Sequence, residues 1–369
     1  MRSTLKSDTR FFSLLGSDDV KVSFLRKFIA LMCRSNPSFG KGCYVDSAPL
    51  PNDIDGNPFN ALCCHGVDSS EVMARLVLVL DGSTGMPVWY DVIPGNVLDL
   101  NTVMNTVNDV AGTLGIIIDS LVLDAGYISK PLLEAFHIGT DKTVIGRMPA
   151  RKGYPYRTLY GEVKELVGKG KYEFVRGRHA YFGFRKEVEI LGQMEHAYVY
   201  VDHFNALKRF TDYLTGNSED YEKLSLKDKD WQTVRFGYLV LVSNICKSPK
   251  DLLSDYFSRT SIESVFKTCK DYLDLLPLSK WTDSTVRGKI LYDIIGTIGL
   301  LQLRKSLSST AMSTTEMFGK TQSLMCSISK QGMITIETPN KQVKEHYGAL
   351  NVEIPAHLDV SSYKKKLEL

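Results

Sequence analysis

Residues 75–93 read RLVLVLDGSTGMPVWYDVI and decide the fold. The runs 75–80 and 88–93 are rich in aliphatic, β-branched and aromatic side chains, and the turn-forming residues DGSTG lie between them. Two such runs joined by a short, glycine-containing turn predict an antiparallel β-hairpin. We therefore expect a β-sheet to start here.

Segments on both sides of the hairpin extend this sheet. Residues 43–45 form a short strand-like run that leads into Asp46. After the hairpin, helical and strand-like patterns alternate: a helix at 98–114, a strand at 121–124, a helix at 130–136 and a strand at 143–148. Three antiparallel strands followed by alternating helices and parallel strands is the layout of a ribonuclease-H-like domain. We expect an α/β fold in which helices flank a mixed sheet.

The other parts of the chain differ from this core. Residues 149–248 hold short strand-like runs rich in Tyr, Phe, Gly and basic residues, which indicates a β-rich insertion subdomain that interrupts the core. Residues 308–369 show no sustained periodicity. The expected organisation is a short N-terminal helical arm at 1–40, the core at 41–148 and 249–307, the insertion at 149–248 and a C-terminal tail at 308–369.

The composition is that of a soluble globular protein. Hydrophobic residues make up 43% of the 369 positions and charged residues 24%, which excludes disordered and collagenous chains. The net charge of +3 is too small to require a polyanionic partner by itself. Seven cysteines without a CxxC pair indicate neither a disulfide framework nor a zinc ribbon. Since no signal peptide or membrane-spanning stretch is visible, we expect a cytoplasmic protein that has no membrane partner.

Three acidic residues are candidates for chemistry. Asp46 and Asp124 each follow an apolar strand-like run, and Glu263 lies in a predicted helix at 260–275. Carboxylates at adjacent strand ends can converge on one cleft, where they suit two magnesium ions about 4 Å apart. The alternative for each aspartate taken alone is a turn or cap residue.

The surroundings of Glu263 follow a regular spacing. Tyr256, Arg259, Glu263 and Lys270 fit the pattern Y-x2-R-x3-E-x6-K. Together with Lys267 they would share one face of a continuous helix. A carboxylate within a basic stripe suits a phosphodiester site, because the cations can hold the DNA backbone. The alternative is an ordinary solvated face on which Glu263 pairs with Lys267.

These motifs resemble those of a known family. Three further segments share in the resemblance: VDSAPL at 45–50, IPGNVLDLNT at 93–102 and VLDAGYIS at 122–129. The sequence resembles the DDE transposases of bacterial and archaeal insertion sequences, in the group with the tyrosine, arginine, glutamate and lysine motif. The resemblance covers about residues 41–148 and 237–307.

The resemblance implies roles for individual residues. Asp46, Asp124 and Glu263 would be the catalytic residues and the ligands of two Mg²⁺ or Mn²⁺ ions. The residues that would contact the DNA end are Tyr256, Arg259 and Lys270. Lys267 is an additional phosphate contact on spacing alone, and Trp231 is our choice for an aromatic ring that holds a flipped base.

The resemblance also implies the partners and the reaction. They are double-stranded DNA with terminal inverted repeats, target DNA, and a second copy of the chain in a homodimer on DNA, in a prokaryotic and nucleoid-associated setting. Water would hydrolyse the phosphodiester at the element end, and the freed 3′ hydroxyl would attack target DNA. In agreement, no GxxxxGK[ST] phosphate loop for nucleotide hydrolysis occurs.

The insertion concentrates positive charge. Between Arg147 and Glu189 there are 11 Lys and Arg against 5 Glu, a local charge of +6. We expect a basic surface beside the active site that holds DNA. Its predicted members are Arg147, Arg151, Lys152, Arg176, Arg178, Arg185 and Lys186.

The N-terminal region leaves alternatives open. Only about 45 residues precede Asp46, which is short for a unit that recognises inverted repeats, so we expect an N-terminally truncated copy. The main alternative is a truncated or domesticated DNA-binding inhibitor that dimerises with full-length transposase and does no chemistry. A metal-dependent nuclease without strand transfer is a third hypothesis.

Overall fold

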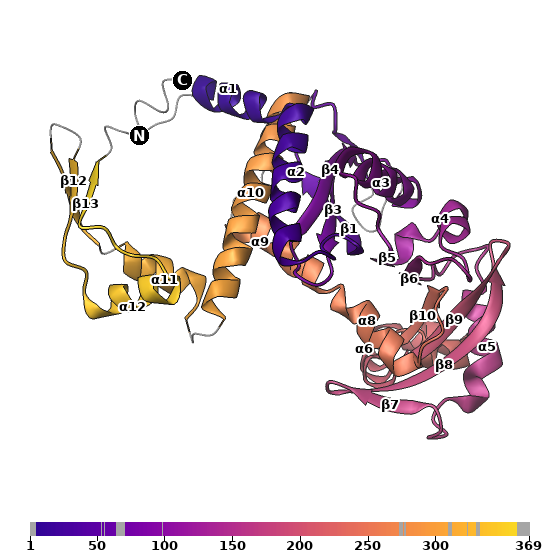
Figure 1. Cartoon of the computed structure of the whole chain (residues 1–369). Coiled ribbons are helices and arrows are strands. Elements are labelled where there is room, and N and C mark those ends of the chain that lie inside the picture. Colours follow the sequence, from indigo (N-terminus) through magenta and orange to yellow (C-terminus); the bar gives the residue numbers. More distant parts are fainter. Residues whose placement is uncertain are drawn as a thin grey trace. The chain divides into compact units, whose positions relative to one another are not determined.

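Figure 1 shows the chain as a computed structural model. The structure describes residues 5–52, 54, 56–63, 71–97, 99–272, 276, 278–308, 312–322, 324–329 and 333–359. The chain forms two compact units, Met1–Asp293 and Ile294–Leu369. Within the described ranges, no helix is long and apolar enough to cross a lipid bilayer.

A ten-stranded sheet runs through the first unit. Its order is β2-β3-β1-β5-β6-β10-β9-β8-β7, and β4 pairs with β3. The strands are β1 (Gly42–Pro51), β2 (Ala61–Leu62), β3 (Val72–Asp81), β4 (Pro87–Pro94), β5 (Ser120–Leu123), β6 (Thr143–Arg147), β7 (Glu173–Arg176), β8 (His179–Ile190), β9 (Gln193–Asp202) and β10 (Tyr238–Ser243).

The strand directions confirm the predicted fold class. Strands β1, β3 and β4 are antiparallel neighbours, and β1, β5 and β6 are parallel neighbours. The described residues thus form the mixed sheet that the sequence predicts for a ribonuclease-H-like fold. The predicted hairpin is β3–β4, and its turn is held by Asp81, whose Oδ2 accepts from the Ser83 hydroxyl at 2.6 Å and the Thr84 N–H at 2.8 Å.

Helices flank both faces of this sheet. All residues 73–81 of β3 are buried, and β5 buries three residues in succession. Because successive side chains of a strand point to opposite faces, both faces must be covered. The helices of the first unit are α1 (Leu5–Leu15), α2 (Asp18–Ser35), α3 (Asp99–Leu114), α4 (Lys130–Ala135), α5 (Tyr156–Val163), α6 (His203–Glu222), α7 (Leu226–Val234), α8 (Pro249–Ser258) and α9 (Ser261–Tyr272). Short 3₁₀ turns are η2 (Ala125–Tyr127) and η3 (Lys164–Leu166), and α10 (Asp283–Leu307) continues beyond this unit.

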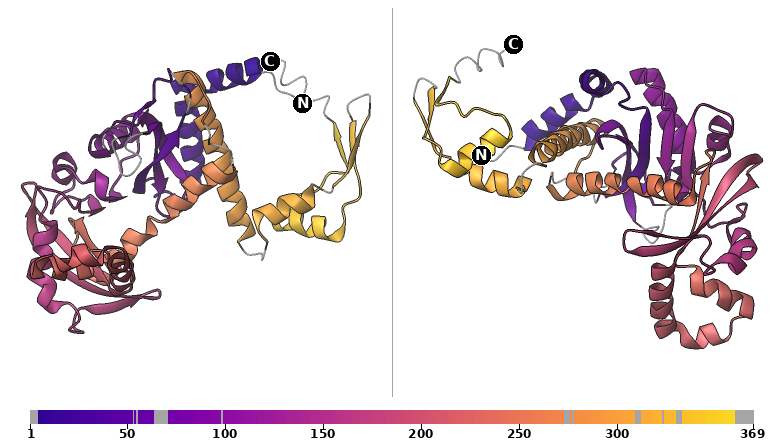
Figure 2. Two further views of the ribbon diagram at one scale, coloured as in Figure 1. Left: turned by 180° about the vertical axis from the view of Figure 1, so that it is seen from behind. Right: turned by 60° about the horizontal axis from the view of Figure 1, so that its bottom comes forward.

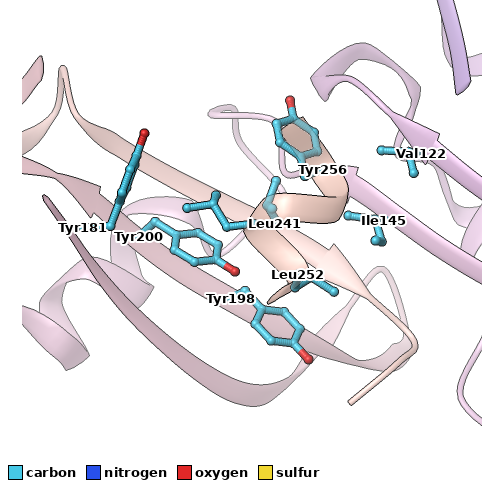
Figure 3. Close-up of a cluster of buried hydrophobic side chains, with 9 residues drawn as sticks. Val122, Ile145, Tyr181, Tyr198, Tyr200, Leu241, Leu252 and Tyr256 are labelled. Carbon is cyan, nitrogen blue, oxygen red and sulfur yellow. The ribbon is translucent and has the colours of Figure 1, made fainter. Parts of the chain in front are cut away.

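Helix α8 is anchored to the sheet by a cluster of buried side chains (Figure 3). Leu252, Leu253 and Tyr256 of α8 pack with Val122 of β5, Ile145 of β6, Leu241 of β10 and tyrosines of β8 and β9. Burying a large apolar side chain stabilises a fold by about 1.5–3 kcal/mol. The cluster therefore fixes α8, and with it the residues that follow, against β5 and β6.

The insertion extends the sheet of the core. Strand β10 pairs with β6 on one side and with β9 on the other, so β7 to β10 continue the same sheet. Residues 149–248 also contain α5, α6 and α7. The sequence pattern indicates each strand but not the strand it pairs with. It therefore predicts a separate subdomain and does not show that these strands join the core sheet.

Two other regions also differ from the expectation. The arm at 1–40 contains α1 in addition to the predicted helix, α2. The region expected to be a tail folds into α11 (Thr314–Thr321), β11 (Cys326–Ile328), β12 (Met333–Ile336), α12 (Lys341–Ala349) and β13 (His357–Asp359), with β11, β12 and β13 in one sheet. Elements of three to nine residues are too short to show a sustained period.

Candidate active site

Two aspartates lie next to each other where β1 and β5 stop pairing. The parallel register pairs Val45 with Leu123 and ends there. Asp46 and Asp124 are the next residues on the two strands, so their backbones are neighbours. Asp124 follows its strand, as predicted. Asp46 does not end its strand, because β1 continues to Pro51 through its pairing with β3.

One guanidinium joins the two carboxylates. Arg259 donates from Nη1 to Oδ2 of Asp46 at 2.7 Å, and its Nη2 lies 3.5 Å from Oδ2 of Asp124. The Arg259 side chain is only 9% exposed, so water screens these interactions little. Burial alone lowers the pKa of Arg259, but Asp124, Tyr256 and Asp46 outweigh it and raise the pKa above its usual value. A permanently charged cation therefore holds two like charges together.

Tyr256 contacts the same carboxylate. Its hydroxyl donates to Oδ1 of Asp124 at 3.2 Å. Burial, helped by the Asp124 charge, raises the pKa of Tyr256 to about 12, although Arg259 lowers it in part. At neutral pH the phenol is thus a neutral hydrogen-bond donor and cannot serve as a base.

A break between α8 and α9 brings Arg259 to this position. Helix α8 ends at Ser258, and α9 begins at Ser261 (Figure 2). At the break, the Arg259 N–H donates to the carbonyl of Tyr256 at 3.2 Å, three residues back. Such a tight turn changes the direction in which successive side chains point. Arg259 therefore turns toward the sheet and not along the face of α9.

The break divides the five motif residues into two groups. Tyr256 and Arg259 are buried, whereas Glu263 and Lys267 are exposed and Lys270 is half-buried. The single face expected for a continuous helix is therefore not formed. Glu263 and Lys267, both in the described part of the chain, make no ion pair with each other, so the alternative of a simple solvated pair is not formed either.

Glu263 lines the same cavity as Tyr256 and Arg259. This cavity has a volume of about 550 Å³. Its arginines are Arg147, Arg176, Arg178, Arg209 and Arg259. The other acid in its lining, Asp202, is engaged by His179 Nδ1 at 2.7 Å and by the Asn205 side-chain amide at 2.8 Å. The cavity is therefore strongly positive, which suits a polyanion.

The donors fit a divalent metal ion in part. Asp46 and Asp124 direct carboxylate oxygens to one cation, and such hard oxygen donors suit Mg²⁺ or Mn²⁺. Among the described residues, however, no three His, Cys, Asp or Glu side chains form a group that could hold a metal. The structure thus brings together two of the three predicted ligands and places Glu263 in the first turn of α9.

Trp231 lies in an aromatic cluster of the inserted region. Its ring centroid is 6.4 Å from that of Tyr156, 5.4 Å from Tyr160 and 5.2 Å from Tyr238. The Arg157 guanidinium also lies over the ring, at 5.5 Å. These contacts give Trp231 a packing role, and its contact with a flipped base stays a prediction.

Sequence reasoning missed two features of the site. Arg209 of α6 lines the cavity, but a lone arginine on a helix carries no signal in one sequence. The bridge from Arg259 to both aspartates was also missed, since the resemblance assigned Arg259 to DNA alone. Only the register of β1 on β5 and the break after α8 could have shown it.

The family described as "Transposase DDE domain" matches residues 53–291. The chain belongs to this family. Asp124, Arg259 and Glu263 of this DDE transposase domain lie within the matched range, and Asp46 lies shortly before it.

The other comparisons add context. No curated protein sequence matches the chain. One solved structure that matches is described as "Cryo-EM structure of piggyBac transposase synaptic complex with hairpin DNA", with 12% sequence identity and a TM-score of 0.39. The match covers 74% of this chain and 50% of that one, so the chain spans about half the length of the transposase it matches.

Proposed function

We propose that the chain breaks DNA strands at the ends of a mobile element and joins the freed ends to target DNA. The observation that carries the proposal is the pair of adjacent aspartates, Asp46 and Asp124, bridged by Arg259. An arginine-lined cavity that also contains Glu263 adjoins this pair through Arg259. Membership in the transposase DDE domain family supports the same function.

The reaction conserves phosphodiester bonds in its second step. First, a water oxygen bonds to phosphorus and the bond from phosphorus to the 3′ oxygen breaks, which leaves a 3′ hydroxyl and a 5′ phosphate. Next, the 3′ hydroxyl oxygen bonds to a target phosphorus, and the target 3′ oxygen leaves with a proton. Since one phosphodiester replaces another, no external energy source is needed.

The residues of the site have distinct roles in this proposal. Asp46 and Asp124, completed by Glu263 from the start of α9, would hold two Mg²⁺ or Mn²⁺ ions. Such ions activate water and stabilise charge on the attacking and leaving oxygens. Arg259 and Tyr256 donate hydrogen bonds to the DNA end when the aspartates no longer hold them. Lys267 and Lys270 follow Glu263 on α9 and contact DNA phosphates.

We further infer the type of element. The spacing of the motif from Tyr256 to Lys270 supports an insertion-sequence transposase of the tyrosine, arginine, glutamate and lysine group, with a cut-and-paste reaction. Its substrates would be double-stranded DNA with terminal inverted repeats and a target DNA, held by a homodimer. Trp231 is retained as the proposed contact of a flipped base.

The test uses two substitutions at opposite ends of β5. Plasmid DNA carrying the ends of the element that encodes the chain is incubated with Mg²⁺ or Mn²⁺, and nicking is measured. Asp124→Asn should reduce nicking by at least about 100-fold and leave DNA binding largely intact. Asp119→Asn, an exposed carboxylate just before β5, should leave nicking unchanged.

Other outcomes would exclude the proposal. Undiminished nicking by Asp124→Asn would remove Asp124 from the site. Binding without nicking by the unaltered chain would favour the inhibitor that dimerises with a full-length transposase.

A further inference from the structure

A second cavity lies at the amino-terminal end of α8. Its volume is about 660 Å³, and it is formed by β7, β8 and the segment that leads into α8. It shares none of its lining residues with the arginine-lined cavity at the other end of α8. We call it the α8 entry cavity. Its cations are Lys171, Arg185, Lys247 and Lys250, and its aromatic residues are Tyr172, Phe174 and Phe184.

The acid that lines the α8 entry cavity is already engaged. Oε2 of Glu173 contacts Nε2 of His203 at 2.7 Å, and its Oε1 accepts from the Gly168 N–H at 2.8 Å. Lys247 pairs with Asp255 at 2.7 Å. The charge of Glu173 is therefore directed to His203 and not to the lysines around the cavity.

Three cations of the cavity lack such a partner. Within the part of the chain that the structure describes, Lys171, Arg185 and Lys250 make no ion pair. All three are exposed. Other basic residues of the inserted region are paired: Lys186 contacts Glu162 at 2.6 Å. The cavity thus keeps an excess of positive charge that the structure itself does not neutralise.

The walls of the cavity are aromatic. Tyr172 and Phe184 meet edge to face at a centroid distance of 5.2 Å, and the Lys171 ammonium lies 5.1 Å from the Tyr172 ring centre. Gly183 lets Phe174 and Pro249 pack closely at this wall, because a Cβ there would lie 2.6 Å from Cε1 of Phe174 and 3.0 Å from Cβ of Pro249. Arg185 also contacts the Cys246 thiol but, among the described residues, no carboxylate. Half-buried rings beside cations without an acidic partner are the features that bind an unpaired nucleotide.

We propose that the α8 entry cavity binds a nucleotide of a DNA strand. Lys171, Arg185 and Lys250 neutralise its phosphates, and Tyr172 or Phe184 stacks on its base. A free phosphate requires neither a cavity of this volume nor aromatic walls. The N–H groups at the start of α8 are not the ligands, because Ser248 and Asp251 already cap that end.

The position of the cavity deepens the proposed function, on which it rests. Helix α8 has 10 residues, so it is about 15 Å long. At about 3.4 Å per stacked nucleotide, this length corresponds to about four nucleotides. A strand whose end lies at Arg259 can therefore pass along α8 and reach the cavity.

The test compares two variants, each of which replaces one lysine by glutamate at a matched position of a helix. Lys250 and Lys227 both stand two residues after a serine cap, in α8 and α7, and each precedes an aspartate whose N–H donates to that serine. A glutamate in the first turn is favourable for a helix, so Lys250→Glu and Lys227→Glu should both fold. Only the first lies in the cavity.

Binding is measured by fluorescence anisotropy with a labelled single-stranded oligonucleotide of about twelve nucleotides, in EDTA and over a range of salt. Lys250→Glu should weaken binding by about 5-fold or more and reduce the slope of log K against log salt by about one unit. Lys227→Glu should change neither. Equal behaviour of the two variants, or displacement of the oligonucleotide by millimolar inorganic phosphate at constant ionic strength, would overturn the proposal.

A crosslink locates the strand independently. A 5-iodouracil oligonucleotide should crosslink to Tyr172 or Phe184, and crosslinks found only outside residues 171–174, 183–185 and 246–250 would contradict the proposal. Because both measurements are made without divalent metal, they do not depend on strand breakage. Binding in the cavity without strand cleavage would exclude the proposed catalytic function and support the cavity as a nucleotide site. Cleavage without a crosslink in the cavity would support the catalytic function and exclude the cavity as a nucleotide site.

Discussion

Arg259 donates to Asp46 at 2.7 Å although 213 residues separate them in the sequence. The same guanidinium reaches Asp124, so one cation balances two carboxylates that would otherwise repel each other. A divalent metal held by these carboxylates would compete with Arg259 for them. Its binding would then release Arg259 for a DNA phosphate.

Removal of Arg259 should lower the stability of the metal-free chain and raise its affinity for metal. Arg259→Ala leaves two neighbouring carboxylates without their cation, which should destabilise the metal-free chain by about 3 kcal/mol. Mn²⁺ should then bind more tightly than to the unaltered chain and restore the lost stability, while DNA cleavage falls. Thermal unfolding with and without Mn²⁺ and a titration of bound Mn²⁺ measure these effects.

Arg157→Ala is the control for this experiment. Arg157 pairs with Asp228 on the surface, far from the aspartate pair in sequence, at 2.6 Å. Its removal should change stability by less than about 1 kcal/mol and leave Mn²⁺ affinity unaltered. Weaker Mn²⁺ binding by Arg259→Ala would show that Arg259 supports the metal site and does not compete with it.

The Tyr256 hydroxyl should matter for cleavage more than for folding. Tyr256→Phe keeps the ring in its buried cluster and removes the hydrogen bond to Asp124. We expect a loss of about 1 kcal/mol in stability and about a 10-fold loss in nicking rate. Tyr198→Phe removes a hydroxyl from the same cluster that bonds instead to the Ile245 carbonyl, so it should reduce stability alone. Equal nicking rates for the two variants would argue against a role for the phenol.

Glu195 should make stability depend on pH. Burial raises the pKa of Glu195 from 4.5 to about 7, and neither carboxylate oxygen has a hydrogen-bond partner among the described residues. The folded state therefore holds this proton to higher pH than the unfolded state, and stability falls as pH rises from about 5 to about 8. Glu195→Gln should remove up to about 3 kcal/mol of this dependence. Denaturant unfolding at several pH values measures it, with the exposed Glu189→Gln as the control. An unchanged pH profile for Glu195→Gln would contradict this assignment.

Patterns that repeat along the chain were predictable from the sequence, and contacts between distant segments were not. The β3–β4 hairpin, β5, β6 and α4 follow from local composition and periodicity. The pairing of β10 with β6 does not, because a strand does not encode its partner. For the same reason the sequence gives Asp46 and Asp124 as candidates, but only the β1–β5 register makes them neighbours. The turn at Arg259 separates Glu263 from the buried face. Helical spacing assumes one continuous helix and therefore does not predict this turn.

The arginine-lined cavity should bind DNA without regard to sequence. Replacing Arg147, Arg176 and Arg178 by alanine should weaken binding to two unrelated DNAs about equally and reduce the salt slope by about two to three units. The control replaces Arg157 and Lys164, two cations of the same region that are already paired with carboxylates. An unchanged slope in the first variant would assign DNA retention to Arg259, Lys267 and Lys270 alone.

The central claim is that Asp46, Asp124 and Glu263 together form the metal site for DNA cleavage. The most direct measurement is a crystal structure of the full chain with Mn²⁺ and a DNA end, in which anomalous scattering locates the metal. We expect manganese bound by Asp46 and Asp124, with Glu263 moved in to complete the ligands and Arg259 turned to a phosphate. Manganese bound elsewhere, or a cleaved DNA end with Arg259 still bridging the two aspartates, would contradict it.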